Sequence, residues 1–536
     1  NILNFVKSFK PHVYTVIQDQ DDLDTDTNAQ HTSIRKSSVA EEDVGFFWHL
    51  TDFHVDLNYI LDNSTRLWGS YEQDASNLVA MTAISHVDSI EFDSEPPDFI
   101  IWGGDSAPHR KQPTKGELLA ALQYISGHFQ ILLSNHDAQF IPIVGQWDSW
   151  PARSMSPQLN SLEREQWCTQ LAKDDMLWKL WIDAARASVR AVRDLPQADF
   201  TRDCYQSLLF NGKKNRVLIL ALNSLVWYRR NPKADREMID PLHQFDWMVK
   251  SLEWARKNEV KVLIVTHFPV GAPPVNSLKS FYLHDTYNEK LVEILTKFSD
   301  VIITTLTGHT HVDSFKLVLD EHHIPVGSIL MGPSVSPRRV RDIGPTNPRI
   351  RQYKYDRKSG VILDYVQYYL NLSQPDPVWM VEYEAVMEYS LDSISPDRLA
   401  RLLDEFTLVD NIEGRWDSYW RHELGGPDHD DRAGLQPGGT CPKRASVCRC
   451  ELICSARSLT RSQLSKCLEV CHSSLFPELH TIQDMIRSAR TNASTVVSVL
   501  IVVILSLTLV AVVGLLVYRK YHSPGYHHAP MHRFYQ

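Results

Sequence analysis

The feature that most constrains this chain is a series of short apolar runs, each of which ends in a polar or glycine-rich turn. From Phe46 onward, the runs include FFWHL before TDFH, FIIW before GGD, FIPIV before GQWD, KVLIVT before HFPVG and VIITTL before TGHTH. Stretches with apolar residues at helical spacing lie between several of the runs, as at 116–133 and 243–256. Strands that alternate with helices predict an α/β fold with buried sheets.

Aspartate and histidine side chains recur at the ends of these runs. In chain order, the run ends supply Asp52-Phe53-His54, Gly103-Gly104-Asp105, Gly145-Gln146-Trp147-Asp148, Thr266-His267 and Gly308-His309-Thr310-His311. Ligands in α/β folds gather at the carboxyl ends of strands, so we expect these side chains to converge. Any one of them alone would be an ordinary turn residue. Imidazole and carboxylate are the expected ligands of borderline cations, so the whole set predicts a centre of two metal ions.

Two neighbouring stretches compete for one place in this centre. Asn135-His136-Asp137 follows a long helix-like stretch, where Asn is an ordinary C-terminal capping residue. Gly145-Gln146-Trp147-Asp148 follows the strand-like FIPIV run instead. We therefore expect the second stretch to lie in the site and the first to be a helix end.

The C-terminal part of the chain predicts a membrane anchor. Residues 496–517 are an uninterrupted apolar run without charge, and a helix needs ~20 such residues to cross a bilayer. Arg519 and Lys520 follow the run, and basic residues beside a span mark its cytoplasmic side. We expect a single-pass type I protein with an extracellular or endolysosomal lumenal ectodomain and a cytoplasmic tail at 518–536. A glycolipid-anchor signal would instead end in its hydrophobic tail.

Cysteine usage agrees with that topology. An even number of cysteines in a non-cytosolic segment predicts disulfide bonds. The candidates are Cys168, Cys204, Cys441, Cys448, Cys450, Cys454, Cys467 and Cys471. Zinc binding by the C-terminal cluster is the alternative, but its spacing lacks the paired C-x2-C pattern. The sequons at Asn63 and Asn371 predict glycosylation if the topology is right.

Composition suggests the remaining boundaries. The acidic, polar segment 1–45 lacks apolar periodicity and is expected to be disordered. A catalytic domain at 46–375, a helical disulfide-rich subdomain at 376–476 and a stalk at 477–495 are expected to follow. The formal charge of −10 over 536 residues argues against a nucleic-acid polymer as the partner.

The motif series D-x-H, G-D, H and G-H-x-H resembles that of the calcineurin-type metallophosphoesterases. More closely, the chain resembles the acid sphingomyelinase-like phosphodiesterases over about 46–471, through HLTDFHVDLNY, GGDSAPH, GPSVSPRRVRDIGPTNPRIRQYKYD and DYVQYYLNL. The resemblance implies a metallophosphoesterase β-sandwich flanked by helices. It also implies hydrolysis of phosphodiesters by metal-activated hydroxide.

The resemblance further implies a role for each site residue. One zinc ion would be held by Asp52, His54 and His311 and the other by His267 and His309, with Asp105 bridging them and Gln146 in the place of the family's Asn ligand. Two such cations can activate water and clamp the oxygens that attack and leave phosphorus. His109 matches a family histidine near the leaving group and would protonate it, the alternative being a loop histidine that caps a turn.

The third motif departs from the family pattern, since it reads G-Q-W-D where the family has G-N-H-D. Gln146 keeps an amide oxygen, but its extra methylene moves that oxygen, so the second metal site would be weakened. Trp147 offers only an indole N–H and cannot exchange a proton as imidazole does. Loss of such a group commonly lowers the rate by ~10²–10⁴-fold.

Two functions follow from these residues. We favour a membrane-anchored zinc phosphodiesterase that acts on a small phosphodiester, a nucleotide or a phospholipid head group, because six ligands and His109 are intact. The alternative is a catalytically impaired pseudoenzyme that serves as a binding ectodomain, because of Gln146 and Trp147. Trp102, Trp147 and Tyr282 are candidates either for the substrate pocket or for the core.

Overall fold

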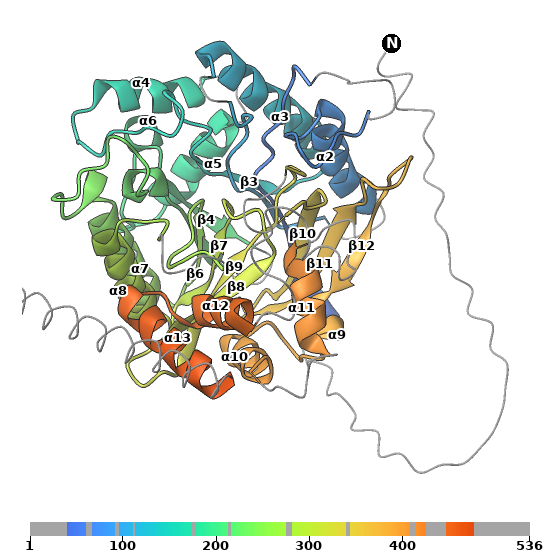
Figure 1. Ribbon diagram of the computed structural model, residues 1–536. Coiled ribbons are helices and arrows are strands. Elements are labelled where there is room, and N and C mark those ends of the chain that lie inside the picture. Colours follow the sequence, from blue (N-terminus) through green and yellow to red (C-terminus); the bar gives the residue numbers. More distant parts are fainter. Residues whose placement is uncertain are drawn as a thin grey trace, which may run out of the picture. The chain divides into compact units, whose positions relative to one another are not determined.

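Two six-stranded sheets form the centre of the protein, and helices surround them (Figure 1). The computed structural model describes residues 40–59, 67–91, 96–110, 113–173, 178–212, 216–274, 281–338, 344–407, 414–424 and 446–475. Residues 1–39 of the segment predicted to be disordered, the stalk, the membrane span and the cytoplasmic tail lie outside these residues, as do Asn63, Cys441 and the side chain of Cys448. The prediction of disorder was wrong for the last residues of its segment, which form η1 (Glu41–Asp43) and the start of β1 (Val44–Leu50) because β1 pairs with β10 (Arg349–Asp356).

The first sheet has the strand order β12-β11-β10-β1-β2-β3. Its strands are β1 (Val44–Leu50), β2 (Phe99–Trp102), β3 (Gln139–Pro142), β10 (Arg349–Asp356), β11 (Ile362–Leu370) and β12 (Trp379–Glu384). β1, β2 and β3 are parallel, with Leu50 opposite Trp102 and Trp102 opposite Pro142. The strands β10, β11 and β12 extend the sheet antiparallel to one another.

The second sheet has the order β4-β5-β6-β7-β9-β8. Its strands are β4 (Gln206–Asn211), β5 (Arg216–Ala221), β6 (Lys261–Thr266), β7 (Ile302–Thr307), β8 (Ser314–Leu319) and β9 (Pro325–Met331). The four inner strands are parallel, and β4 and β8 form antiparallel edges. The apolar runs thus became buried parallel strands, as buried parallel sheets require.

The helices are α2 (Asn77–Glu91), α3 (Lys115–Asn135), α4 (Leu162–Leu171), α5 (Trp178–Arg190), α6 (Phe200–Asp203), α7 (Gln244–Lys257), α8 (Asp285–Lys297), α9 (Ala385–Glu388), α10 (Pro396–Glu405), α11 (Arg415–Leu424), α12 (Ser446–Arg457) and α13 (Arg461–Leu475). Short 3-10 helices are η1 (Glu41–Asp43), η2 (Ser224–Trp227) and η3 (Pro241–His243). The α/β prediction is confirmed. Among the described residues, no helix is long and apolar enough to cross a membrane.

One hydrophobic core joins the two sheets. It contains side chains from both, and the Phe99 ring of β2 contacts the Phe210 ring of β4 with centroids 5.7 Å apart. Helix α5 packs against β3 and β4, so it spans from one sheet to the other. Trp102 is fully buried between Phe129, Phe140 and Trp178, and it therefore belongs to the core rather than to a pocket.

Three disulfide bonds connect six of the predicted cysteines. Cys168 of α4 pairs with Cys204, and the pairs Cys450–Cys471 and Cys454–Cys467 join α12 to α13. These two helices pack around a small separate core with Ala272 and Phe281. The segment predicted as a helical subdomain opens with the strand β12, which pairs with β11, and only then continues as helices.

Candidate metal centre

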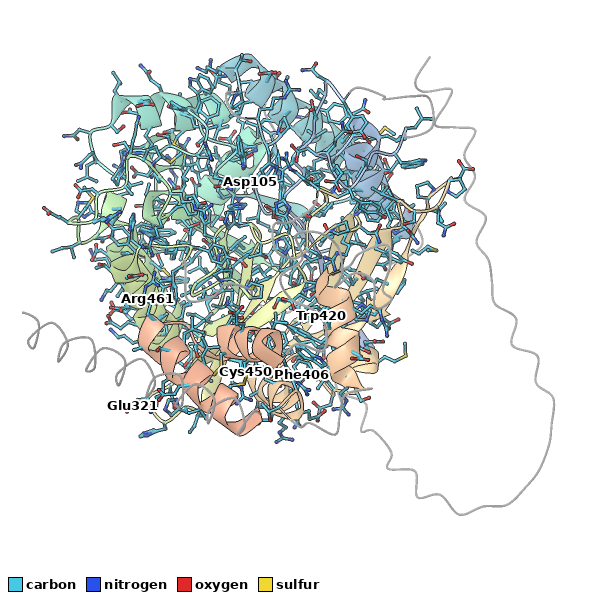
Figure 2. All side chains as sticks on the ribbon, in the orientation of Figure 1. Asp105, Glu321, Phe406, Trp420, Cys450 and Arg461 are labelled. Carbon is cyan, nitrogen blue, oxygen red and sulfur yellow. A yellow bond between two sulfur atoms is a disulfide. The ribbon has the colours of Figure 1, made fainter. Side chains whose placement is uncertain are left out.

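The loops that follow β1, β2, β3, β6 and β7 bring their side chains together around the buried Asp105. Figure 2 labels the position of Asp105 among the other side chains. Backbone hydrogen bonds hold the first two loops together, from Asp52 N to Gly104 O (2.9 Å) and from His54 N to Asp105 O (3.0 Å). Glycine permits this close approach, because a Cβ at Gly145 would overlap Asp105 Oδ1. The convergence predicted from the strand ends is therefore present.

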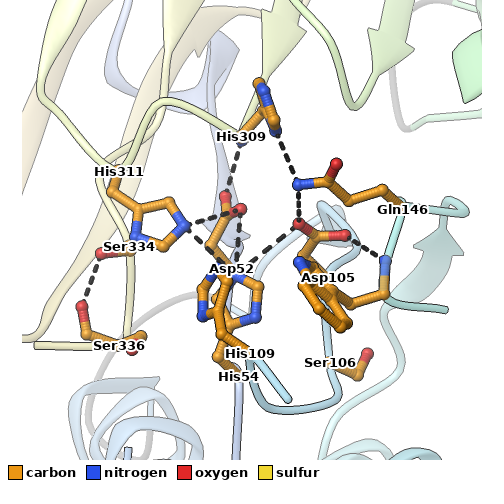
Figure 3. A network of polar contacts seen from close by, with 12 residues as sticks. Asp52, His54, Asp105, Ser106, His109, Gln146, His309, His311, Ser334 and Ser336 are labelled. Atoms are coloured by element: carbon orange, nitrogen blue, oxygen red, sulfur yellow. Dashed lines mark hydrogen bonds and ion pairs between the residues drawn. The ribbon is translucent and has the colours of Figure 1, made fainter. Parts of the chain in front are cut away.

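The first half of the centre consists of Asp52, His54 and His311, whose side chains lie close to one another (Figure 3). His54 Nε2 lies 3.1 Å from His311 Nε2, and Asp52 Oδ1 lies 3.4 Å from His311 Nε2 and 3.8 Å from His54 Nε2. Asp52 Oδ2 accepts hydrogen bonds from Thr51 Oγ1 (2.7 Å) and His309 N (2.9 Å). Asp52 Oδ1 is buried without a hydrogen-bond partner, so it is available as a ligand.

The second half consists of Asp105, His267 and His309, with Gln146 beside them. Asp105 Oδ2 lies 3.2 Å from His267 Nε2 and 3.6 Å from His54 Nε2, so this carboxylate belongs to both halves. His267 Nδ1 is 2.9 Å from the carbonyl oxygen of Gly103, which can only accept. The proton therefore lies on Nδ1 and leaves Nε2, which is buried without a hydrogen-bond partner, free to bind a metal.

The electrostatics of the cluster favour a cation. Burial opposes charge on His267, but Asp105 and Asp52 outweigh it and raise the pKa of His267 to about 9. Burial, with the help of His267, lowers the pKa of His309 to about 3. The protein thus compensates its two buried carboxylates with a positive charge at this point. A divalent ion bound to the neutral imidazoles would serve the same purpose.

The residues present fit two metal ions. Three groups of side chains offer ligand atoms that lie within 4.8 Å of one another: Asp52, His54 and Asp105; Asp105, His267 and His309; and His54, His109 and His311. The first two groups share Asp105, as a bridging carboxylate would. The third group would make His109 a ligand rather than an acid.

The structure brings the G-Q-W-D loop to the centre. Gln146 Nε2 lies 3.4 Å from both Asp105 Oδ2 and His309 Nδ1, whereas Gln146 Oε1 is buried without a hydrogen-bond partner. Rotating the amide by 180° would exchange these two atoms and turn the oxygen toward the second half. Asn135 instead ends α3 and, with His136, contacts Asp88 away from the centre.

Asp148 holds this loop in place, a role that sequence reasoning missed. Its carboxylate accepts hydrogen bonds from the backbone N–H groups of Asp105 (2.6 Å), Gly145 (2.7 Å) and Ser106 (2.8 Å). It thereby fastens the G-D loop to the G-Q-W-D loop. The only available signal was an acidic residue at the end of the third motif.

His109 lies against the first half of the centre. Its ring stacks on His54 with centroids 3.8 Å apart, and the Trp147 ring meets it edge-on at 5.2 Å. Its Nδ1 is 2.7 Å from Asp74 Oδ1, a partner that sequence reasoning also missed. Burial and the charge of His54 lower the pKa of His109 to about 4, while Asp74 acts in the opposite direction.

Aromatic side chains surround His309 in the second half. The rings of Phe268, Tyr282 and Tyr228 have centroids 4.5, 5.1 and 5.6 Å from that of His309. Tyr282 and Trp147, two of the predicted pocket aromatics, therefore do lie at the centre.

Five of the candidate ligand residues have an unusual backbone conformation. Asp52, His54, Asp105, His309 and His311 all have positive φ, between 42° and 69°. Side chains with a Cβ avoid this left-handed region, and each such residue costs roughly 1–2 kcal/mol. These five strained residues meet where the side chains converge, and backbone strain of this kind is typical of functional sites.

Comparison with known proteins identifies the family. Residues 47–313 match the calcineurin-like phosphoesterase family, and residues 324–474 match the acid sphingomyelin phosphodiesterase C-terminal region. The cyclic GMP-AMP phosphodiesterase SMPDL3A of Bos taurus is 30% identical, and the match covers 69% of this chain and 81% of that protein. The chain belongs to the acid sphingomyelinase-like phosphodiesterases.

Two further proteins are similar to this chain. The acid sphingomyelinase-like phosphodiesterase 3b of Homo sapiens is 25% identical, over 82% of this chain and 93% of that protein. A crystal structure of a dimetal phosphatase from Danio rerio is 11% identical with a TM-score of 0.35, over 63% of this chain and 99% of that one. The metallophosphoesterase fold of the family implies a divalent metal, which the donor groups described above fit.

Proposed function

We propose that this protein is a zinc-dependent phosphodiesterase that hydrolyses a small phosphodiester or nucleotide. The proposed ligands are Asp52, His54, Asp105, His267, His309, His311 and, after rotation of its amide, Gln146. The observation that carries the proposal is that two groups of metal donors share the Asp105 carboxylate. When bound, the two ions would supply the charge that activates water and stabilises the anionic phosphate.

The chain's own residues would position the metal donors and supply the proton for the leaving oxygen. The buried loops fasten the donors, and the stacked, partly exposed His109 would give a proton to the leaving oxygen.

The alternative function is a pseudoenzyme that binds a ligand without turning it over. Gln146 favours it, because its nitrogen rather than its oxygen faces Asp105 and His309. Trp147 favours it as well, because it packs against His109 where the family has a second imidazole. The strained backbone of the ligands argues against it, since a binding protein without metal would have no use for that strain.

One assay separates the two functions. The full chain would be stripped of metal, reloaded with zinc and assayed on bis(p-nitrophenyl) phosphate, beside a Gln146→Asn/Trp147→His double variant. We expect both proteins to turn over, with the double variant faster by about tenfold or more. Activity in the double variant alone would favour the pseudoenzyme, and no activity in either would contradict both the site and the reaction. An Asn135→Ala/His136→Ala variant is the matched control, since it alters a similar pair of residues away from the centre.

We further propose that the protein is a glycosylated single-pass membrane protein with the enzyme outside the cytoplasm. The support is the apolar run at 496–517, the basic residues after it, the sequons and the three disulfide bonds. Asn371 lies in a partly exposed turn after β11, as a glycan acceptor must. Resistance to carbonate extraction and a mobility shift after glycosidase treatment would test both parts.

A further inference from the structure

Asp74 holds His109 at two points. The residue lies just before α2, its side chain is 6% exposed, and both of its carboxylate oxygens contact His109. Oδ2 accepts a hydrogen bond from the His109 backbone N–H at 2.6 Å, and Oδ1 lies 2.7 Å from Nδ1 of its ring. Arg338, from the segment after β9, donates from Nη1 to Oδ2 at 3.1 Å. Segments that are distant in the sequence therefore meet on one buried carboxylate.

These contacts with Asp74 determine which ring nitrogen of His109 is available for proton transfer. A carboxylate can only accept hydrogen bonds, so Nδ1 must carry the hydrogen that lies between them. Nε2 is then the nitrogen left for the reaction, and it has no hydrogen-bond partner among the described residues. The rings of His54 and Trp147 on its sides restrict rotation.

We propose that Asp74 is the positioning residue for the proton transfer from His109 to the leaving group; this inference rests on the proposed function. In the step, water adds its oxygen to phosphorus and the bond from phosphorus to the leaving oxygen breaks. The electron pair of that bond stays on the leaving oxygen. His109 enters the step as the imidazolium, keeps its Nδ1 hydrogen on Asp74 and gives its Nε2 proton to that oxygen. The proton that water loses replaces it by the end of the turnover, so the products are a phosphomonoester and an alcohol.

Asp74 matters more in this chain because Trp147 stands where the family pattern has a second histidine. The other four histidines of the centre, at positions 54, 267, 309 and 311, are assigned as ligands, and an indole cannot donate its proton to a leaving group. His109 is thus the remaining imidazole for this step. Its orientation depends on Asp74, which lies 35 residues away in the chain.

The experiment compares two leaving groups in the full chain and in Asp74→Asn. p-Nitrophenolate leaves without help from an acid, whereas an alkoxide needs a proton as the bond breaks. We expect Asp74→Asn to lower kcat for a methyl phosphodiester by about 10²-fold, with little change in KM, and to leave kcat for the p-nitrophenyl ester within about threefold. A proportional loss on both esters would mean a merely structural role, and no loss on either would exclude the positioning role.

Asp88→Asn is the matched control. Asp88 contacts His136 Nε2 at 2.8 Å, so it forms the same kind of carboxylate–imidazole pair away from the centre. We expect it to change neither rate. The zinc content of Asp74→Asn should also equal that of the unmodified chain. A lower content would overturn the proposal in favour of His109 as a metal ligand, the role that its group with His54 and His311 also permits.

A measurement without turnover separates this inference from the proposed function. If the unmodified chain cleaves neither ester, the proposed function fails, and ¹⁵N NMR of histidine-labelled protein then tests Asp74 alone. The signal of His109, assigned by its loss in His109→Asn, should report a protonated Nδ1 in the unmodified chain and a change of tautomer in Asp74→Asn. An unchanged His109 signal would overturn the positioning role.

Discussion

The two halves of the candidate metal centre differ in whether their oxygen ligands already face the place where a metal would bind. In the first half, hydrogen bonds occupy one oxygen of Asp52 and leave the other free toward His54 and His311. In the second half, Gln146 turns its nitrogen toward Asp105 and His309, so its oxygen must rotate before it can bind a metal. The Asp148 carboxylate nevertheless binds the backbone of the Gln146 loop to that of the Asp105 loop. A motif can therefore change its chemistry while its scaffold stays intact.

The largest effect should come from the residue that the halves share. Asp105→Ala removes the oxygen close to both His54 and His267, so we expect activity on a phosphodiester to fall on the order of 10³-fold. Zinc content, measured by mass spectrometry, should fall in both halves. His136→Ala should change neither value. If Asp105→Ala lost metal from one half only, the halves would be independent and the bridging role would be wrong.

The stability of the protein should depend on pH through Lys316, a buried lysine that contacts the loop after His267. Lys316 of β8 donates hydrogen bonds to Ala272 O, on the loop after His267, and to Ser455 O of α12. Burial lowers its pKa from 10.5 to about 7, with Glu423 opposing. The unfolded chain therefore binds more protons between these pH values. Stability should rise with pH there, by roughly 1 kcal/mol for each pH unit, and gain nothing from this group below pH 7.

Lys316→Met isolates this contribution. The free energy of unfolding of the unmodified chain, relative to that of the variant, should increase from pH 7 to pH 9 in denaturant titrations. An exposed lysine such as Lys250, which pairs with Asp246 on the surface, is the matched control. A constant difference across this range would show that Lys316 keeps its proton in the folded protein.

A smaller effect is expected from metal affinity in the second half. Gln146→Asn places the amide one methylene further back, as in the family pattern, and should tighten the weaker of two zinc ions by about tenfold. Calorimetric titration of the metal-free chain would resolve the two affinities. The tighter ion should be unaffected, because it belongs to the half formed by Asp52, His54 and His311. If Gln146→Asn raised the affinity for both zinc ions equally, the proposed difference between the two halves would be wrong.

The smallest effect concerns backbone strain. His311 has φ of 63°, so glycine should fit its backbone better than alanine does. We expect metal-free His311→Gly to be more stable than His311→Ala by about 1 kcal/mol, measured by thermal unfolding. The opposite order is expected at an exposed helical position such as Lys250. Equal stability of the His311 variants would mean that the loop relaxes when the imidazole is removed.

The sequence predicted the parts of the site that depend on local pattern. Apolar runs identified the strands, and their ends therefore identified Asp52, Asp105 and His267. The preceding secondary structure also distinguished Gln146, after a strand, from Asn135, at the end of α3. Six predicted cysteines form disulfide bonds. The pairing of the four on α12 and α13 could not be read from the sequence, because it depends on how these two helices meet.

The parts that sequence reasoning missed depend on contacts through space. Asp74 and Asp148 act on residues 35 and 43 positions away. Nothing in the local sequence distinguishes Asp74 from a surface acid, and the motif that contains Asp148 does not show which backbone groups it holds. The strand β12 was missed for a related reason, since it exists as the edge partner of β11. A short stretch takes its structure from such a neighbour as much as from its own residues.

The left-handed backbone of the five ligands also bears on the history of this protein. In a lineage that no longer used the metal, glycine at any of these positions would stabilise the fold, and nothing would oppose its spread. In this chain the five positions hold aspartate or histidine, although glycine would relieve the backbone at each of them. Side chains that cost stability in this way are expected where they bind a metal, and are not expected where they only complete the fold.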